Sequence, residues 1–227
     1  MEASPPRPRA NPTSVRADLS EGFSYIWRDK DVRLLAFVFC GVVLAGFSYQ
    51  TIMPGYLENT LGHPASQLGV IYGATAIGGI VVTLVLASRR LANAPAVMLF
   101  FGACMAASLA LLAIAPGFWA ALGVASLVGA SSSGFQMLNN VNLMERADPK
   151  YFGRVMSVTM MAFGFNSIIS YPVGIIADHS GERATLGGLA VATMTVVLLG
   201  MLALRSRTRE VAAAAALQEQ PLGAPGR

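Results

Sequence analysis

Hydrophobic positions along this chain gather in six segments that contain no Asp, Glu, Lys or Arg. These segments cover residues 34–57, 67–88, 96–115, 117–138, 155–177 and 185–204. A helix rises about 1.5 Å per residue, so about 20 apolar residues cross a hydrocarbon layer of about 30 Å. Inside that layer the backbone polar groups must be satisfied within the segment, which selects helices. The pattern predicts an all-α membrane protein with six transmembrane helices.

Polar segments flank this hydrophobic region at both ends. Residues 1–17 are rich in Pro, Arg and Ser, which predicts a flexible cytoplasmic leader. Residues 18–33 are expected to form an amphipathic helix in the membrane interface, with Asp18 as its cap. Its apolar face would carry Leu19, Phe23, Ile26 and Trp27. Residues 205–227 are predicted to form a cytoplasmic tail.

The placement of charge predicts how the chain is oriented. Of the 16 Lys and Arg residues, all but Arg183 fall on the side that holds both termini. By the positive-inside rule that side is the cytoplasm. We therefore expect a multi-pass protein of the plasma (cytoplasmic) membrane in contact with the lipid bilayer. The basic residues are spread over four segments and form no single patch, so nucleic acid is not an expected partner.

Composition and spacing exclude several kinds of chemistry. Only 12% of the residues are charged, against about 25% in soluble domains. Cys40 and Cys104 lie inside predicted helices as packing residues, and His63 and His179 lie far apart in the sequence. No spacing resembles a metal site, and the six hydrophobic segments contain no His or charged residue that could act as a base or a ligand. We expect no metal, no cofactor and no enzymatic activity.

Small residues four positions apart predict where the helices touch, because helices in a bilayer associate through close packing. Each hydrophobic segment has at least one such pair. The pairs include Gly41/Ala45, Gly69/Gly73, Gly102/Ala106, Ala125/Gly129, Ser170/Gly174 and Gly188/Ala192.

Three further stretches carry motifs. Residues 19–35, LSEGFSYIWRDKDVRLL, contain L-x-E-G-x-x-Y, and residues 161–181 end in P-x-G-x-x-A-D-x-x-G. Residues 146–156, RADPKYFGRVM, match P-x-x-R-G-R-V except that Phe152 stands where Arg is usual. Together these stretches resemble the carboxy-terminal half of a major facilitator superfamily transporter, in the branch that includes enterobactin and multidrug exporters.

That resemblance implies half of a major facilitator fold, made of two inverted three-helix repeats with both termini cytoplasmic. It implies efflux of a small organic solute, drug-like or siderophore-like, by alternating access. A complete transporter of this family has twelve spans and this chain has six. The expected partner is therefore an amino-terminal half or a second copy of the chain. The alternative is a truncated remnant, or a membrane interaction subunit that does not transport.

In this family the first and fourth helices of each half line the substrate cavity, and the second and fifth flank it. The resemblance thus implies cavity residues on the first, fourth and fifth segments, where polar and aromatic side chains recur at helical spacing. An interhelical hydrogen bond is the alternative role for each amide. The candidates are Phe47, Tyr49, Gln50, Ser132, Gln136, Asn139, Asn140, Phe163, Asn166 and Ser170.

Four loop residues are candidates for a cytoplasmic gate or for orientation in the membrane. Arg89 and Arg90 follow the second segment, and Gly153 and Arg154 precede the fifth. Such cations either contact lipid headgroups or latch onto acidic groups and helix ends of the other half.

Overall fold

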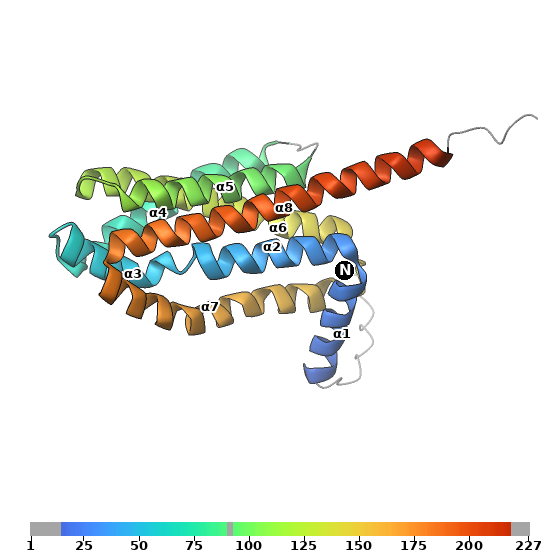
Figure 1. Ribbon diagram of the computed structural model, residues 1–227, viewed down its shortest axis with the longest axis horizontal. Coiled ribbons are helices and arrows are strands. Elements are labelled where there is room, and N and C mark those ends of the chain that lie inside the picture. The colour runs from blue at the N-terminus through green and yellow to red at the C-terminus, as the bar shows by residue number, and fades with distance from the viewer. Residues whose placement is uncertain (1–14, 90–92, 219–227) are drawn as a thin grey trace, which may run out of the picture.

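The computed structural model describes residues 15–89 and 93–218, and it is helical almost throughout (Figure 1). Six helical segments are long and apolar enough to cross a membrane, which confirms the predicted class. The helices are α1 (Val15–Arg28), α2 (Lys30–Gly46), α3 (Tyr49–Gly55), α4 (Leu68–Ala87), α5 (Ala94–Ala113), α6 (Phe118–Arg146), α7 (Phe152–Ser180) and α8 (Glu182–Gln218). A π-helical turn, Tyr56–Thr60, extends α3, and a 3-10 turn, Ala65–Gln67, precedes α4. The predicted leader lies outside the described residues as far as residue 14, as do residues 219–227 of the tail.

The long helices run side by side, and α1 leaves the bundle at a steep angle (Figure 1). α4 packs on α6, α5 packs between α6 and α8, and α2 contacts α8, α7 and α6. α1 packs against the beginning of α7. α1 and the last turns of α8 therefore lie at the same end of the bundle.

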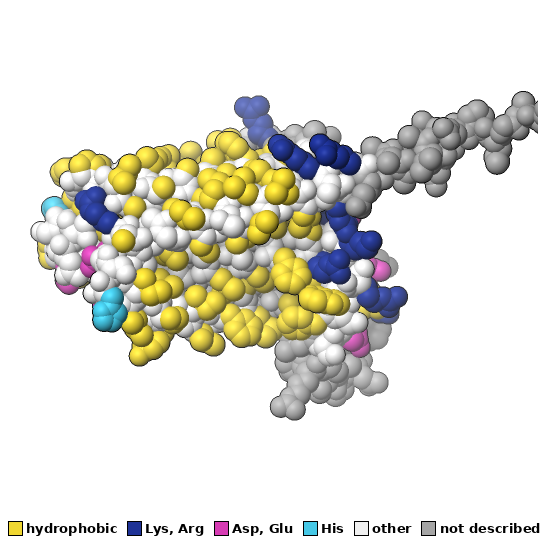
Figure 2. All heavy atoms as spheres, viewed as in Figure 1, with side chains coloured by type: hydrophobic (Ala, Val, Ile, Leu, Met, Phe, Trp, Pro, Cys, Tyr) yellow, Lys and Arg dark blue, Asp and Glu magenta, His cyan; other side chains and the backbone are white. Residues whose placement is uncertain are grey.

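Charged side chains mark the two ends of the bundle, and its sides are mostly hydrophobic (Figure 2). Basic side chains gather at the end that holds α1, where α8 also carries Arg205, Arg207 and Arg209. Arg207 forms a salt bridge with Asp31 at the start of α2. The opposite end carries Glu58, Arg183 and both histidines. This separation supports the predicted sidedness, which stays a prediction.

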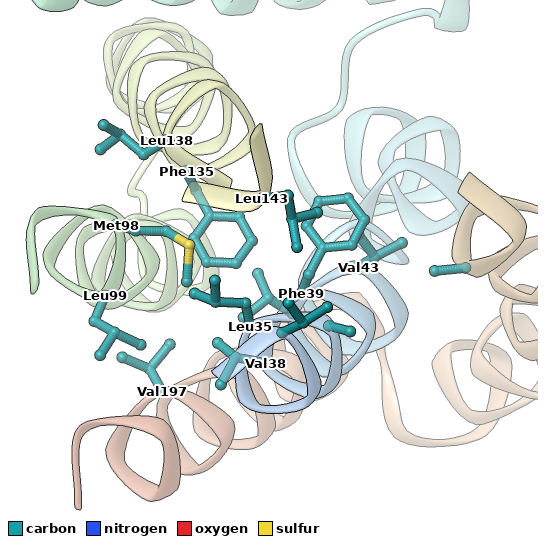
Figure 3. Packing of buried hydrophobic residues seen from close by; sticks show 14 of the residues in the cluster. Leu35, Val38, Phe39, Val43, Met98, Leu99, Phe135, Leu138, Leu143 and Val197 are labelled. Atoms are coloured by element: carbon teal, nitrogen blue, oxygen red, sulfur yellow. The ribbon is translucent and has the colours of Figure 1, made fainter. Parts of the chain in front are cut away.

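Buried aromatic and aliphatic side chains fill the bundle between α2, α5, α6 and α8. Phe39 of α2 stacks with Phe135 of α6, with ring centroids 6.1 Å apart. Met98, Leu143 and Val197 surround them (Figure 3). This packing holds the first and fourth spans together. It therefore determines which side chains of these two spans remain at the surface of the bundle.

The structure corrects the predicted helix over 18–33. The first helix begins at Val15, so Asp18 lies inside it and is not its cap. It ends at Arg28 because the carboxylate of Asp29 accepts hydrogen bonds from the backbone N–H groups of Asp31 and Val32, at 2.9 and 3.1 Å. That N-cap starts a new helix, which turns the chain toward the membrane.

Two predicted helix ends are also too early. α6 continues past Leu138 to Arg146, and Asp148-Pro149 follows, a pair that disfavours helix. α8 continues past Leu204 to Gln218, so residues 205–218 of the predicted tail are helical. Loss of hydrophobic character marks where a helix leaves the membrane, whereas turn chemistry marks where it ends.

Glycines bring α4 and α6 into backbone contact. A Cβ on Gly78 would overlap the carbonyl oxygen of Ser126, and one on Gly129 would overlap that of Thr75. The prediction of a contact at Gly129 is confirmed, whereas the pair Gly69/Gly73 is wrong, because neither glycine has another residue within 4 Å of a Cβ.

Candidate functional site: a broken span beside a polar face

The first span is interrupted near its middle. α2 ends at Gly46, and α3 begins at Tyr49, after two intervening residues. The Ser48 hydroxyl lies 2.7 Å from the carbonyl oxygen of Leu44 and 2.9 Å from Oδ1 of Asn166 on α7, and its single hydrogen bonds to one of these two acceptors at a time. Discontinuous helices place backbone polar groups at the sites where transporters bind their substrates. Asn166, a predicted cavity residue, therefore lies at the break.

Pro54 frees a carbonyl group close to this break. Proline has no N–H, so the carbonyl oxygen of Gln50, four residues earlier, has no helical donor. The Tyr72 hydroxyl of α4 donates to that oxygen, at 3.3 Å. Gln50 and Thr51 are themselves exposed. The second span therefore contacts the first span at the position where the first span lacks a helical hydrogen bond.

Aromatic side chains close the other side of the break. Phe163 of α7 meets Phe47 edge to face, with centroids 5.6 Å apart, and meets Phe39 at 5.9 Å. Phe47 is buried and Phe163 is half-buried. These contacts tie the fifth span to the first.

The predicted cavity residues divide into two groups by exposure. Gln50 is exposed, and Gln136, Asn140, Phe163 and Asn166 are half-buried. Phe47, Tyr49, Ser132, Asn139 and Ser170 are buried within the chain. We give the name polar face to the first group together with Tyr72, on α3, α4, α6 and α7. Contacts at the break connect Tyr72 to Gln50 and Asn166 to Ser48, whereas Gln136 and Asn140 are assigned to the face by their exposure and by the predicted role of α6. Sequence reasoning missed Ser48 and Tyr72, although a hydroxyl in a charge-free span was the available signal.

Two asparagines on α6 have opposite environments. Asn139 is fully buried, and neither polar atom of its amide has a hydrogen-bond partner. Asn142 is equally buried, but its Nδ2 donates to the Leu138 carbonyl oxygen and its Oδ1 accepts from Nη1 of Arg146, both at 2.8 Å. In this conformation Asn139 lies inside the bundle and not on the polar face.

Replacing Asn139 with leucine is expected to stabilise the chain by about 1 kcal/mol or more, because it removes an unsatisfied buried amide. The same change at Asn142 should destabilise by a similar amount, because it removes two side-chain hydrogen bonds, to the Arg146 guanidinium and to the Leu138 carbonyl oxygen, which keeps only its helical donor. Thermal unfolding of both variants in detergent checks the pair. Destabilisation by Asn139→Leu would show that its amide has a partner in the membrane.

A second cluster lies at the end that carries the basic residues. Glu21 of α1 forms a salt bridge with Arg154 of α7, at 2.5 Å. Tyr25 stacks on Tyr151, with centroids 4.7 Å apart, and its hydroxyl accepts from the backbone N–H of Asp148, at 2.9 Å. We call these contacts between α1 and α7 the end clamp. The acid that Arg154 contacts is thus in its own chain.

The other predicted gate residues show no comparable contact. Gly153 is exposed, with nothing within 4 Å of a Cβ, and Arg89 is exposed at the end of α4. Arg90 lies outside the described residues. Nor do the described residues include a group of three or more His, Cys, Asp or Glu side chains that could hold a metal ion.

These features together define a helical membrane protein with a broken span beside a neutral polar face. The family model of the Major Facilitator Superfamily matches residues 2–171. The chain belongs to this superfamily, which agrees with the predictions of transport and of a non-enzymatic function.

One curated relative extends the comparison. The "Staphyloferrin A transporter" of Staphylococcus aureus (strain NCTC 8325 / PS 47) is 24% identical over 159 residues, which are 70% of this chain and 40% of that protein. The chain thus spans well under half of the length of this relative. No solved structure matches the chain significantly.

Proposed function

We propose that this chain is one half of an exporter that moves a small organic solute out of the cytoplasm by alternating access. Membrane transport of a small solute is the function that the family supports. The six spans and the 40% coverage of a curated transporter support the need for a second half, either an amino-terminal half or a second copy. We place the complete transporter in the plasma membrane, with both termini of this chain in the cytoplasm.

The polar face is the observation that carries this proposal. It combines amides and a hydroxyl, from Gln50, Gln136, Asn166 and Tyr72, with the aromatic ring of Phe163. Such neutral donors and acceptors beside apolar surface suit an amphipathic solute. The name of the relative favours a siderophore-like compound. Among the described residues no carboxylate belongs to this face, so any proton coupling would come from the second half.

Two spans offer their surface to the second half. In each span we compare the apolar stretch of 18 residues and the share of it that is buried inside the chain. That share is 17% for the span that contains α4 and 22% for α7, against 61% for the first span. Both helices flank the broken span, since Tyr72 of α4 and Asn166 of α7 contact it. A partner packed on α4 and α7 would enclose the polar face as one wall of a cavity.

Co-expression tests the proposal. Cells that produce this chain with a candidate amino-terminal half should export a fluorescent amphipathic dye or an iron-free siderophore faster than cells with either half alone. The variants Gln50→Leu and Asn166→Leu should each lower the export rate about tenfold, since an unpaired polar group costs about 1–3 kcal/mol.

Thr195→Val is the matched control, because Thr195 is exposed on α8 and its hydroxyl donates within its own helix. It should leave export unchanged. The mass of the purified chain in detergent gives a second measurement. A lone monomer that neither binds a candidate half nor exports would instead support the alternative, a subunit or remnant that does not transport.

A further inference from the structure

An apolar groove of about 750 Å³ lies between α5 and α8, where α5 ends and α8 begins. Its volume falls within the range of about 300–1,000 Å³ that is usual for small-molecule sites. α5 contributes one wall and α8 the other. The lining residues are Ala106, Ala107, Ala110, Ala113, Ile114, Arg183, Ala184, Gly187, Ala190, Val191 and Met194.

The groove exists because its walls carry small side chains. Alanines recur along α5, and Gly187 of α8 has no other residue within 4 Å of a Cβ. Larger apolar side chains stand at its edges, where Ile114 is 71% exposed and Val191 is 67% exposed. This surface is separate from the polar face, and in a bilayer it meets lipid.

Arg183 gives the groove a fixed positive charge at its mouth. Its guanidinium donates to the carbonyl oxygens of Ala113 and Ala115, at 3.1 and 2.8 Å, which holds it at the end of α5. Arginine has five N–H donors, so others remain for a ligand. Among the described residues no carboxylate pairs with it, since the neighbouring Glu182 accepts from Asn59 and Thr60 instead.

We propose that this groove binds an anionic phospholipid. One acyl chain lies between α5 and α8, and the headgroup phosphate accepts hydrogen bonds from Arg183. A guanidinium forms strong bidentate hydrogen bonds with phosphate oxygens. A transmembrane helix from another chain fits less well, because its apolar surface would cover an arginine without supplying a counter-charge.

Native mass spectrometry of the purified chain, in detergent with equal amounts of phosphatidylglycerol and phosphatidylcholine, tests this site. The unmodified chain should retain phosphatidylglycerol preferentially. Arg183→Gln should lower that preference about fivefold, the effect of one basic side chain at an anionic surface. The chain retaining both lipids equally would overturn the proposal.

Matched variants separate the groove from general attraction to basic residues. Arg89→Gln removes an exposed charge at the other end of the bundle and should leave most of the preference intact, whereas a loss equal to that of Arg183→Gln would refute a specific site. Gly187→Leu fills the groove and should reduce retention of phosphatidylglycerol. Gly188→Leu adds the same side chain one residue away, outside the lining and equally free of contacts, and should not.

The same spectra report a competing occupant. If Gly187→Leu abolishes a dimer of the chain and leaves lipid retention unchanged, the groove binds a second helix, and the lipid proposal is wrong. Lipid retention and dimer formation are both measured without transport, so this test is independent of the proposed function.

Discussion

Replacing Gly129 with alanine is expected to lower the free energy of unfolding by about 3 kcal/mol or more, at or beyond the upper end of the usual cost of overpacking. A methyl group there would overlap the carbonyl oxygen of Thr75. That oxygen belongs to the backbone of α4 and cannot rotate away, so the two helices must separate. Thermal unfolding in detergent, followed by circular dichroism, measures the loss.

Gly123→Ala is the matched control on the same helix, because a Cβ at Gly123 meets nothing within 4 Å. Both substitutions gain the same helix propensity, so the difference between them isolates the contact with α4. Gly78→Ala and Gly73→Ala repeat the comparison on α4. Equal melting temperatures for Gly129→Ala and Gly123→Ala would show that α4 and α6 do not touch in this way.

Replacing Tyr25 with alanine is expected to destabilise the end clamp by about 1.5–2.5 kcal/mol. The change removes the stack on Tyr151, worth about 0.5–1.5 kcal/mol, and a hydrogen bond from the backbone of Asp148, worth about 1 kcal/mol. Hydrogen exchange should then accelerate in α1 and at the start of α7. Hydrogen exchange in α5 should not change, because α5 packs mainly on α6 and α8 and not on the end clamp.

Tyr25→Phe keeps the ring and loses only the hydroxyl, so it should show about half of this effect, with the stack on Tyr151 retained. If the phenylalanine variant exchanges as fast as the alanine variant, stacking does not hold α1. The salt bridge between Glu21 and Arg154 is a weaker contribution, because both side chains keep contact with water.

The end clamp explains why two of the sequence motifs occur together in this chain, since their residues contact each other. Glu21 and Tyr25 come from L-x-E-G-x-x-Y, and Arg154 comes from the stretch before the fifth span. Gly22 lies between them, where a Cβ would be 3.0 Å from the carbonyl oxygen of Arg154. Motifs more than 100 residues apart thus form one contact.

The hydrophobic pattern determined the six spans, because a bilayer requires long apolar helices wherever the chain crosses it. Helical spacing also predicted which residues share a face. The structure brings Asn166 against the first span and leaves Gln50 exposed, and their role in a substrate cavity stays a prediction. The hydrophobic pattern did not predict how far α6 and α8 extend, because a helix can continue beyond the point where it leaves the membrane.

Only the tertiary structure distinguished residues of the same type on the same helix. Asn139 is buried without a partner and Asn142 is fully paired, although they lie three residues apart. Gly129 contacts a neighbouring backbone and Gly123 contacts nothing. Composition and spacing determined that this chain spans a membrane and which faces its helices have. The environment of each side chain depends on which neighbouring helix packs against it. Packing between segments far apart in the sequence determines that neighbour, so only the tertiary structure shows it.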